Sequence, residues 1–221
     1  DRVGISILES SGYDTNAMAS FFETMQKGTR YVEGSAPSFL RTHPITSERI
    51  ADVSARISNS GRYRMLPYSP EFDLVRAKIM ANLGTAGQAI AQFRGNLQER
   101  RYTSETSQHY GLAIALLRNN DVAGALNELK WLRANAPNHA FFANLAANIE
   151  VAKDNPMGAE KAYLAGLAVY PGSRALINGY AEHFLRIQQP EKAIKLINEK
   201  QSLYPEDPTL YELKSRAYAN L

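Results

Sequence analysis

His43 is the residue whose type and setting could support chemistry by themselves. It stands between Thr42 and Pro44, and a residue before proline is held out of the helical region, so His43 belongs to an extended loop. A neutral imidazole can act as a general base or bind zinc near physiological pH. The alternative is a loop histidine held by a backbone carbonyl, and the residue taken alone favours this alternative.

Metal-binding residue types are otherwise scattered along the chain. The sequence has 4 His and no Cys, which excludes a disulfide framework and cysteine–zinc sites. No His-x-x-x-His spacing occurs. His109, His139 and His183 are separated by whole predicted helices, and we interpret them as packing or surface residues. We therefore expect no catalytic metal site and no tightly bound zinc from these residues alone.

A second group of candidates is suited to binding a polypeptide. Asn144 and Asn178 stand 34 residues apart, and an asparagine amide both donates to and accepts from a peptide backbone. The lysines that would hold a terminal carboxylate are missing at the corresponding positions, so that mode of binding is not expected. The alternative is that the asparagines only solvate a groove that packs on another domain. The candidate binding residues are Tyr110, Phe141, Asn144, Asn148, Asn178 and Glu182, of which the two aromatic residues are possible anchors.

The elements that must position these residues recur with a period of 34. Pro137, Pro171 and Pro205 share this spacing, and so do Ala125, Ala159 and Ala193. Thirty-four residues is the period of the tetratricopeptide repeat, an antiparallel helix pair that stacks into a solenoid. The small alanine lets two helices approach closely, and the proline follows the second helix, which it cannot continue. The predicted units are 106–139, 140–173 and 174–207, followed by a half unit at 208–221.

Upstream of the repeats, the pattern predicts a small helical unit and a linker. Residues 1–60 should hold helices at 2–11, 15–26 and 47–58, with Val3, Ile5, Ile7 and Leu8 on one buried face. Residues 61–70 read as an apolar linker, whose Tyr63, Met65 and Leu66 should be buried and should fix the direction of the solenoid. Residues 71–221 form the repeat domain. Its first helix pair, 72–82 and 86–101, matches the repeat weakly and is interpreted as a cap. The fold class is therefore all-α.

Composition excludes little else. The formal net charge is +3, with basic residues scattered among acidic ones, so nothing indicates nucleic acid as a partner. No apolar run has the length of a membrane span.

Five short motifs in the first sixty residues resemble a known family. They are Asp1-Arg2-Val3-Gly4-Ile5, Ser11-Gly12-Tyr13-Asp14, Ala17-Met18 with Phe21, Leu40-Arg41-Thr42-His43-Pro44, and Ser47-Glu48-Arg49-Ile50-Ala51. In this order they resemble the HtpX-type zinc metallopeptidases. The repeats that follow are similar to those of the BepA-like periplasmic branch, whose members are proteases with C-terminal tetratricopeptide repeats.

The resemblance implies roles for particular residues. In that family, zinc is held by an HExxH helix and by a glutamate four residues before an aspartate. Asp1 corresponds to that aspartate, which would accept a hydrogen bond from a zinc-bound histidine; otherwise it is an acidic residue at a helix N-terminus. His43 would project into the metal cleft to bind substrate, stabilise an oxyanion or contact the zinc as a gate. Arg49 would anchor the same loop through a carboxylate, in a structural and not a catalytic role. HExxH and the glutamate would lie upstream, so we expect this sequence to be a piece of a longer protein.

Two functional hypotheses follow. The first is the C-terminal portion of a periplasmic zinc metalloendopeptidase whose partners are polypeptide substrates and the outer-membrane protein assembly machinery. This hypothesis is compatible with peripheral association with a membrane. The second is a non-catalytic repeat adaptor that binds polypeptides, in which the first sixty residues serve as a helical cap. The upstream sequence would discriminate between them.

Overall fold

The computed structural model describes residues 1–30, 47–57 and 68–221. The described residues contain α-helices and no strand, which confirms the predicted all-α class. The chain divides into two compact units, Asp1–Tyr68 and Ser69–Leu221. The predicted linker residues Tyr63, Met65 and Leu66 lie outside the described residues, so their expected burial stays a prediction.

The first unit contains three described helices, α1 (Arg2–Ser10), α2 (Asn16–Arg30) and α4 (Ser47–Ile57). The predicted spans agree with these helices to within a few residues. Their shared core contains four buried side chains, which are Ile5, Phe22, Val53 and Ile57. The predicted buried face of α1 was partly wrong, because Val3 is 73% exposed and Ile7 is 58% exposed. These two residues stand one turn apart on α1, on a face that the described helices do not cover.

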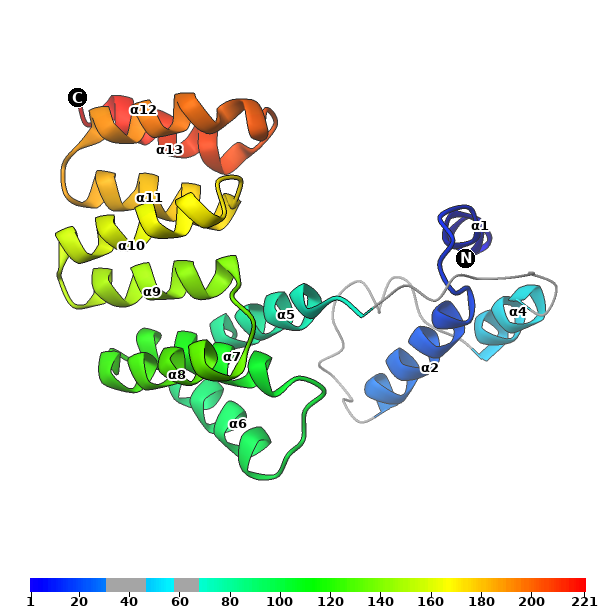
Figure 1. The fold of residues 1–221 in the computed structure, drawn as a ribbon. Helices are drawn as coiled ribbons and strands as arrows, with labels where there is room; N and C mark the ends of the chain where they lie inside the picture. The colour runs from blue at the N-terminus through cyan, green and yellow to red at the C-terminus, as the bar shows by residue number, and fades with distance from the viewer. Residues whose placement is uncertain (31–46, 58–67) are drawn as a thin grey trace. The chain divides into compact units, whose positions relative to one another are not determined.

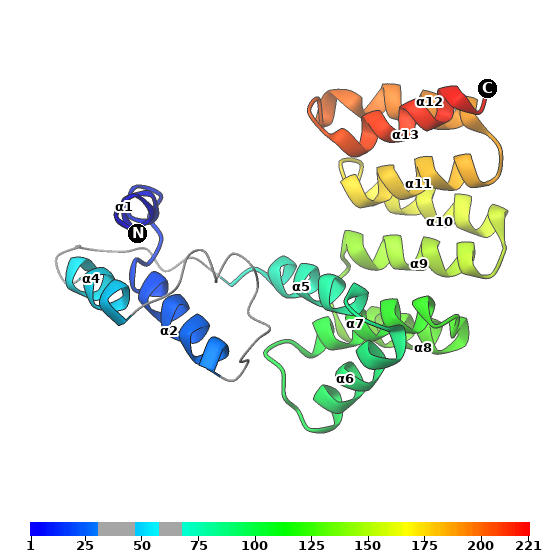
Figure 2. The same cartoon turned by 180° about the vertical axis from the view of Figure 1, so that it is seen from behind.

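The second unit is a stack of antiparallel helix pairs (Figures 1 and 2). Helices α8, α10 and α12 begin at Val122, Pro156 and Pro190, each 34 residues after the one before. The helices of this unit are α5 (Pro70–Asn82), α6 (Ala86–Gln98), α7 (Glu105–Arg118), α8 (Val122–Asn135), α9 (Ala140–Ala152), α10 (Pro156–Val169), α11 (Arg174–Arg186), α12 (Pro190–Lys200) with the 3-10 turn η1 (Gln201–Leu203), and α13 (Pro208–Ala219).

The same local devices start the helices in successive pairs. Asp121 and Asn155 accept hydrogen bonds from the backbone N–H groups of Gly124 and Gly158, and thereby cap α8 and α10. The turn before each second helix contains a residue in the left-handed region, with φ of 59° at Asn120, 54° at Asp154 and 58° at Gln188. These turn residues also recur at a spacing of 34, so the sharp turn within each pair is repeated along with the helices.

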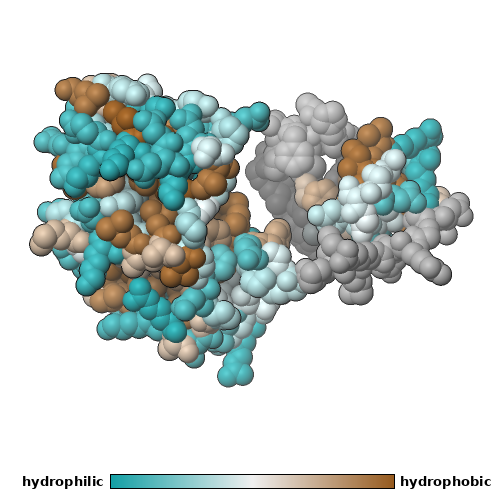
Figure 3. Space-filling model, turned by 45° about the horizontal axis from the view of Figure 1, so that its top comes forward, coloured by the Kyte–Doolittle hydropathy of each residue, from teal (hydrophilic) through white to brown (hydrophobic). Residues whose placement is uncertain are grey.

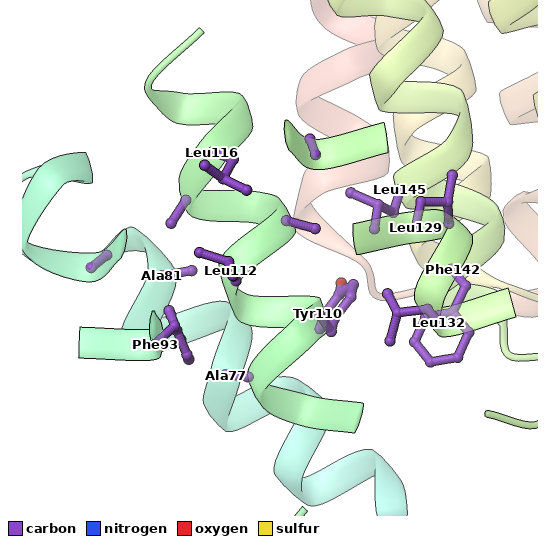
Figure 4. Packing of buried hydrophobic residues seen from close by; sticks show 14 of the residues in the cluster. Ala77, Ala81, Phe93, Tyr110, Leu112, Leu116, Leu129, Leu132, Phe142 and Leu145 are labelled. Atoms are coloured by element: carbon purple, nitrogen blue, oxygen red, sulfur yellow. The ribbon is translucent and has the colours of Figure 1, made fainter. Parts of the chain in front are cut away.

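Small residues lie where the helices approach most closely. Ala125, Ala159 and Ala193 are completely buried, as their recurrence predicted. The first core cluster joins α5 to α9 and includes Phe93, Tyr110, Leu116 and Leu129 (Figure 4). The second joins α9 to α13. The weakly matching first pair, α5 and α6, therefore belongs to the same continuous core as the pairs that follow.

Candidate functional site

Asp1 and Arg49 form a charged pair in the first unit that is held by two hydrogen bonds. Asp1 precedes α1, and Arg49 lies in the first turn of α4. The Arg49 guanidinium donates through Nε to Asp1 Oδ2 at 2.7 Å and through Nη2 to Oδ1 at 2.6 Å. The two side chains are 20% and 34% exposed. This two-pronged geometry fixes the orientation of the carboxylate more tightly than a single contact would.

The local structure explains why Asp1 does not cap its own helix. Asp1 occupies the N-cap position of α1, but its side chain makes no capping hydrogen bond. Both carboxylate oxygens instead face Arg49, whose guanidinium lies 5.0 Å from the centre of the Phe22 ring. The contact joins α1, α2 and α4. Each carboxylate oxygen has a second lone pair, so Asp1 could still accept a hydrogen bond from an incoming histidine.

His43 lies outside the described residues, so its predicted position in a metal cleft stays a prediction. Within residues 1–30, 47–57 and 68–221, no group of three or more metal-ligating side chains comes together. The described side chains therefore do not form a zinc site by themselves.

The second unit carries a cavity that brings together three of the predicted binding residues. The cavity has a volume of about 380 Å³ and lies across α5, α7 and α9, the first helices of three consecutive pairs. Tyr110, Asn144 and Asn148 line it, together with Ile114 and Leu117. We call this cavity the groove pocket. Its wall contains both apolar side chains and amides, which is the combination that binds an extended peptide.

Tyr110 is part of the floor of the groove pocket and does not project from it. It is 2% exposed, and its ring stacks on Phe141 at 5.8 Å between centres. Burial raises the pKa of Tyr110 well above its ordinary value, so the phenol stays neutral. A buried aromatic ring of this kind can form part of an apolar floor beneath a ligand. It cannot insert into a partner protein as an exposed anchor residue would.

The two groove asparagines are oriented by the two helices that follow α9 in the chain, α10 and α11. The Tyr163 hydroxyl of α10 donates to Asn148 Oδ1 at 3.0 Å. Asn144 Oδ1 is inaccessible to solvent, accepts no hydrogen bond from any described residue, and lies against Gly179 of α11. Because both amide oxygens are turned into the protein, the polar atoms that these residues can offer a ligand are the Nδ2 donors.

Phe141, Asn178 and Glu182 do not line the groove pocket. Phe141 is half-buried in its stack with Tyr110, and Asn178 Oδ1 is buried without a partner, like its counterpart at Asn144. Glu182 Oε1 accepts a hydrogen bond from Arg216 of α13 at 3.3 Å and is well exposed. Their role in binding stays a prediction.

Three polar residues of the groove pocket were missed from the sequence. Lys78 and Asn82 stand one turn apart on α5, and Arg118 ends α7. Arg118 donates to the carbonyls of Ala81 and Gly84 and thereby satisfies the C-terminal end of α5. The spacing of Lys78 and Asn82 was a usable signal, but it lies in the helix pair that was interpreted only as a cap.

The repeat histidines are packing residues in part. His183 is 2% exposed, and its ring lies 5.9 Å from that of Tyr163. Burial, followed by the positive charge of Arg186, lowers the pKa of His183. His109 stacks on Trp131 at 3.6 Å and contacts Glu128, while His139 accepts a hydrogen bond from Phe141 N–H at the start of α9.

One face of the second unit carries both hydrophilic and apolar side chains. On the face seen in Figure 3, hydrophilic side chains separate the apolar surface into patches. Among the described helices, none combines the length and hydrophobicity that crossing a membrane requires.

Comparison with known proteins confirms the family resemblance drawn from the first sixty residues. Residues 1–57 match Peptidase family M48. The whole chain is similar to the beta-barrel assembly-enhancing protease of Yersinia pestis, with 27% identity over 99% of this chain and 45% of the relative. It is 26% identical to the Escherichia coli (strain K12) protein of the same name, over 100% of this chain and 45% of the relative.

A Vibrio cholerae relative, described as a putative beta-barrel assembly-enhancing protease, is 26% identical over 100% of this chain and 46% of its own length. The chain thus spans a little under half the length of these relatives. The similarity joins a peptidase-family segment and a helical stack in one continuous match.

Proposed function

We propose that this chain is the C-terminal portion of a periplasmic zinc metalloendopeptidase that acts in outer-membrane protein assembly or quality control. The single observation that carries the proposal is the similarity to beta-barrel assembly-enhancing proteases, which runs along essentially the whole chain. The match of residues 1–57 to Peptidase family M48 supports the peptidase part.

In this proposal, the first unit supports a zinc site whose ligands lie upstream. Asp1, oriented by Arg49, would accept a hydrogen bond from a zinc-bound histidine and fix its tautomer. Bound zinc would supply a water molecule activated for attack on a peptide bond. His43 would contact the substrate or the metal. The isolated chain would be inactive, because the HExxH helix is not among its residues.

The helical stack would be a tetratricopeptide-repeat domain that holds polypeptide substrates. The groove pocket supports this role, because it offers apolar surface beside Asn144 and Asn148 on the first helices of the pairs. The alternative function is a non-catalytic adaptor that binds polypeptides through the same pocket.

The reading frame upstream of Asp1 provides the first test. We expect HExxH, and a glutamate separated from Asp1 by three residues. The complete protein should then bind one zinc per chain and cleave an unfolded outer-membrane protein, and substitution of the HExxH glutamate should abolish cleavage. If the upstream sequence lacks HExxH, and the complete protein binds the unfolded outer-membrane protein without cleaving it, the adaptor function is favoured.

The metal content of the 221-residue chain provides a second test. We expect no stoichiometric zinc by metal analysis and no proteolysis. One zinc per chain that is lost on substitution of His43 alone would contradict this assignment of the ligands.

A further inference from the structure

The groove pocket has an unbalanced set of polar groups. Among the residues that the structure describes, its lining contains two cationic side chains, Lys78 and Arg118, and no aspartate or glutamate. The three asparagines of the lining are uncharged. In a hollow that is partly shielded from water, an excess of positive charge attracts an anionic group more strongly than it would on an open surface.

The cations have different tasks. The Arg118 guanidinium is held in place by the backbone carbonyls of Ala81 and Gly84, so its charge is a fixed part of the wall. Lys78 is exposed on α5 and has no ion pair with any described residue. Its ammonium group is therefore free to move toward a ligand.

The amides add donors to the same lining. Tyr163 holds Asn148 Oδ1, and Asn144 Oδ1 is turned against Gly179, so both side chains have their Nδ2 groups left to donate. Donors from α9 and an ammonium group from α5 thus surround an apolar floor formed by Tyr110, Ile114 and Leu117. Hydrogen bonds from such donors are strongest when the acceptor is a carboxylate.

We propose that the groove pocket selects extended polypeptide segments in which an aromatic or large apolar side chain is flanked by acidic side chains. The apolar side chain packs on the Tyr110 ring and its aliphatic neighbours, and an aspartate or glutamate beside it faces Lys78 and the asparagine amides. The inference rests on the proposed polypeptide-binding function and adds a substrate class to it. The acidic group is a side-chain carboxylate within the segment, not the terminal carboxylate.

Paired peptides test the selectivity. The probes are two fluorescein-labelled octapeptides with amidated C-termini, in which either two aspartates or two asparagines flank a phenylalanine. Binding to the 221-residue chain is measured by fluorescence anisotropy. We expect the aspartate peptide to bind at least about threefold more tightly, with an advantage that shrinks as salt is added.

Two lysine variants locate the effect. Lys78→Gln should reduce the advantage of the aspartate peptide and leave binding of the asparagine peptide nearly unchanged. Lys130→Gln is the matched control, because Lys130 is an exposed lysine on α8 and does not line the groove pocket. It removes the same charge from the chain, so a general electrostatic attraction would respond equally to both substitutions.

The outcomes separate the inference from the function on which it rests. Equal affinity for the two peptides, or equal effects of the two lysine variants, would overturn acidic selectivity while leaving polypeptide binding intact. Failure of the chain to bind either peptide or an unfolded outer-membrane protein would overturn both. If the peptides bind more tightly only when their C-termini are free carboxylates instead of amides, the acidic group that the groove pocket recognises is a terminal carboxylate, and the inference of an internal acidic side chain is overturned.

Discussion

Gly111 of α7 provides a sharp test of the packing around the first core cluster. A Cβ atom at this position would lie 2.3 Å from Phe93 Cζ, 2.5 Å from Cε1 and 2.9 Å from Cε2. Phe93 belongs to α6 and is 4% exposed, so its ring has little room to move away. Gly111→Ala should therefore force α6 and α7 apart, although alanine favours a helix.

The expected magnitude comes from two opposing effects. Carbon atoms pack best at about 3.5–4.0 Å, so the Phe93 ring would have to retreat by roughly 1 Å. Overpacking of this kind costs about 1–3 kcal/mol, while glycine to alanine in a helix interior contributes about 0.5–1 kcal/mol of stability. The overpacking is the larger effect, and the variant should lose on the order of 1 kcal/mol.

Gly95→Ala is the matched control. Gly95 lies inside α6, and no atom would fall within 4 Å of an added Cβ. Only the gain in helix stability applies here, so this variant should be more stable than the parent by about 0.5–1 kcal/mol. Glycine to alanine is thus expected to change the stability in opposite directions at two helix positions, one tightly packed and one open.

Urea unfolding followed by tryptophan fluorescence measures both variants. Trp131 is the single tryptophan and packs against this cluster, so its signal reports on the affected part of the chain. Phe93→Leu should partly rescue Gly111→Ala, because a smaller side chain relieves the overlap. Equal stability of Gly111→Ala and Gly95→Ala would refute the reasoning.

Further predictions concern the neighbouring pairs. Ala159→Leu should overpack α10 and cost about 1–3 kcal/mol; an unchanged melting temperature would argue against close packing there. Asp207 caps α13 and pairs with Arg174 at 2.5 Å, so Asp207→Ala should destabilise the chain at neutral pH by about 1–2 kcal/mol. The Arg174 hydrogen bond lowers the pKa of Asp207 below its ordinary 3.8, so this difference should shrink as acidification protonates the carboxylate; a constant difference in thermal melts would contradict the ion pair. Burial lowers the pKa of His183 from its ordinary 6.5. Below about pH 6.5 the unfolded chain binds a proton at this histidine more readily than the folded chain does, so the folded protein loses stability as the pH falls. His183→Gln should lose less stability than the parent between about pH 7 and about pH 5, and parallel pH profiles would contradict the buried position.

The repeat architecture was predictable because each pair carries the same constraint at the same place. A buried alanine, a proline beyond the second helix and apolar periodicity all agree between 106 and 207. The left-handed residues Asn120, Asp154 and Gln188 carry the same 34-residue signal, but their types differ, so inspection of residue identity did not reveal it. The left-handed backbone conformation therefore recurs from pair to pair, although the residue type at that position changes.

Other features could not be predicted, because they depend on which parts of the chain lie next to each other in space. Val3 and Ile7 have the spacing of a buried face, but spacing cannot show whether a partner surface covers that face. The pairing of Asp1 with Arg49 joins residues 48 apart in sequence, and no local pattern predicts it. Lys78 of the groove pocket was missed because it lies in the helix pair that matches the repeat least well.

The arrangement of the groove pocket implies that its chemistry is set by residues that never touch a ligand. Tyr163 determines which end of the Asn148 amide is available, and Gly179 gives Asn144 Oδ1 a place to pack. Tyr163 belongs to α10, which pairs with α9, and Gly179 belongs to α11, the first helix of the next pair. Because stacking orients the amides before a ligand arrives, little side-chain entropy remains to be lost on binding. The packing of α10 and α11 against α9 therefore does more than close the core: it determines which polar atoms of Asn144 and Asn148 face the groove pocket.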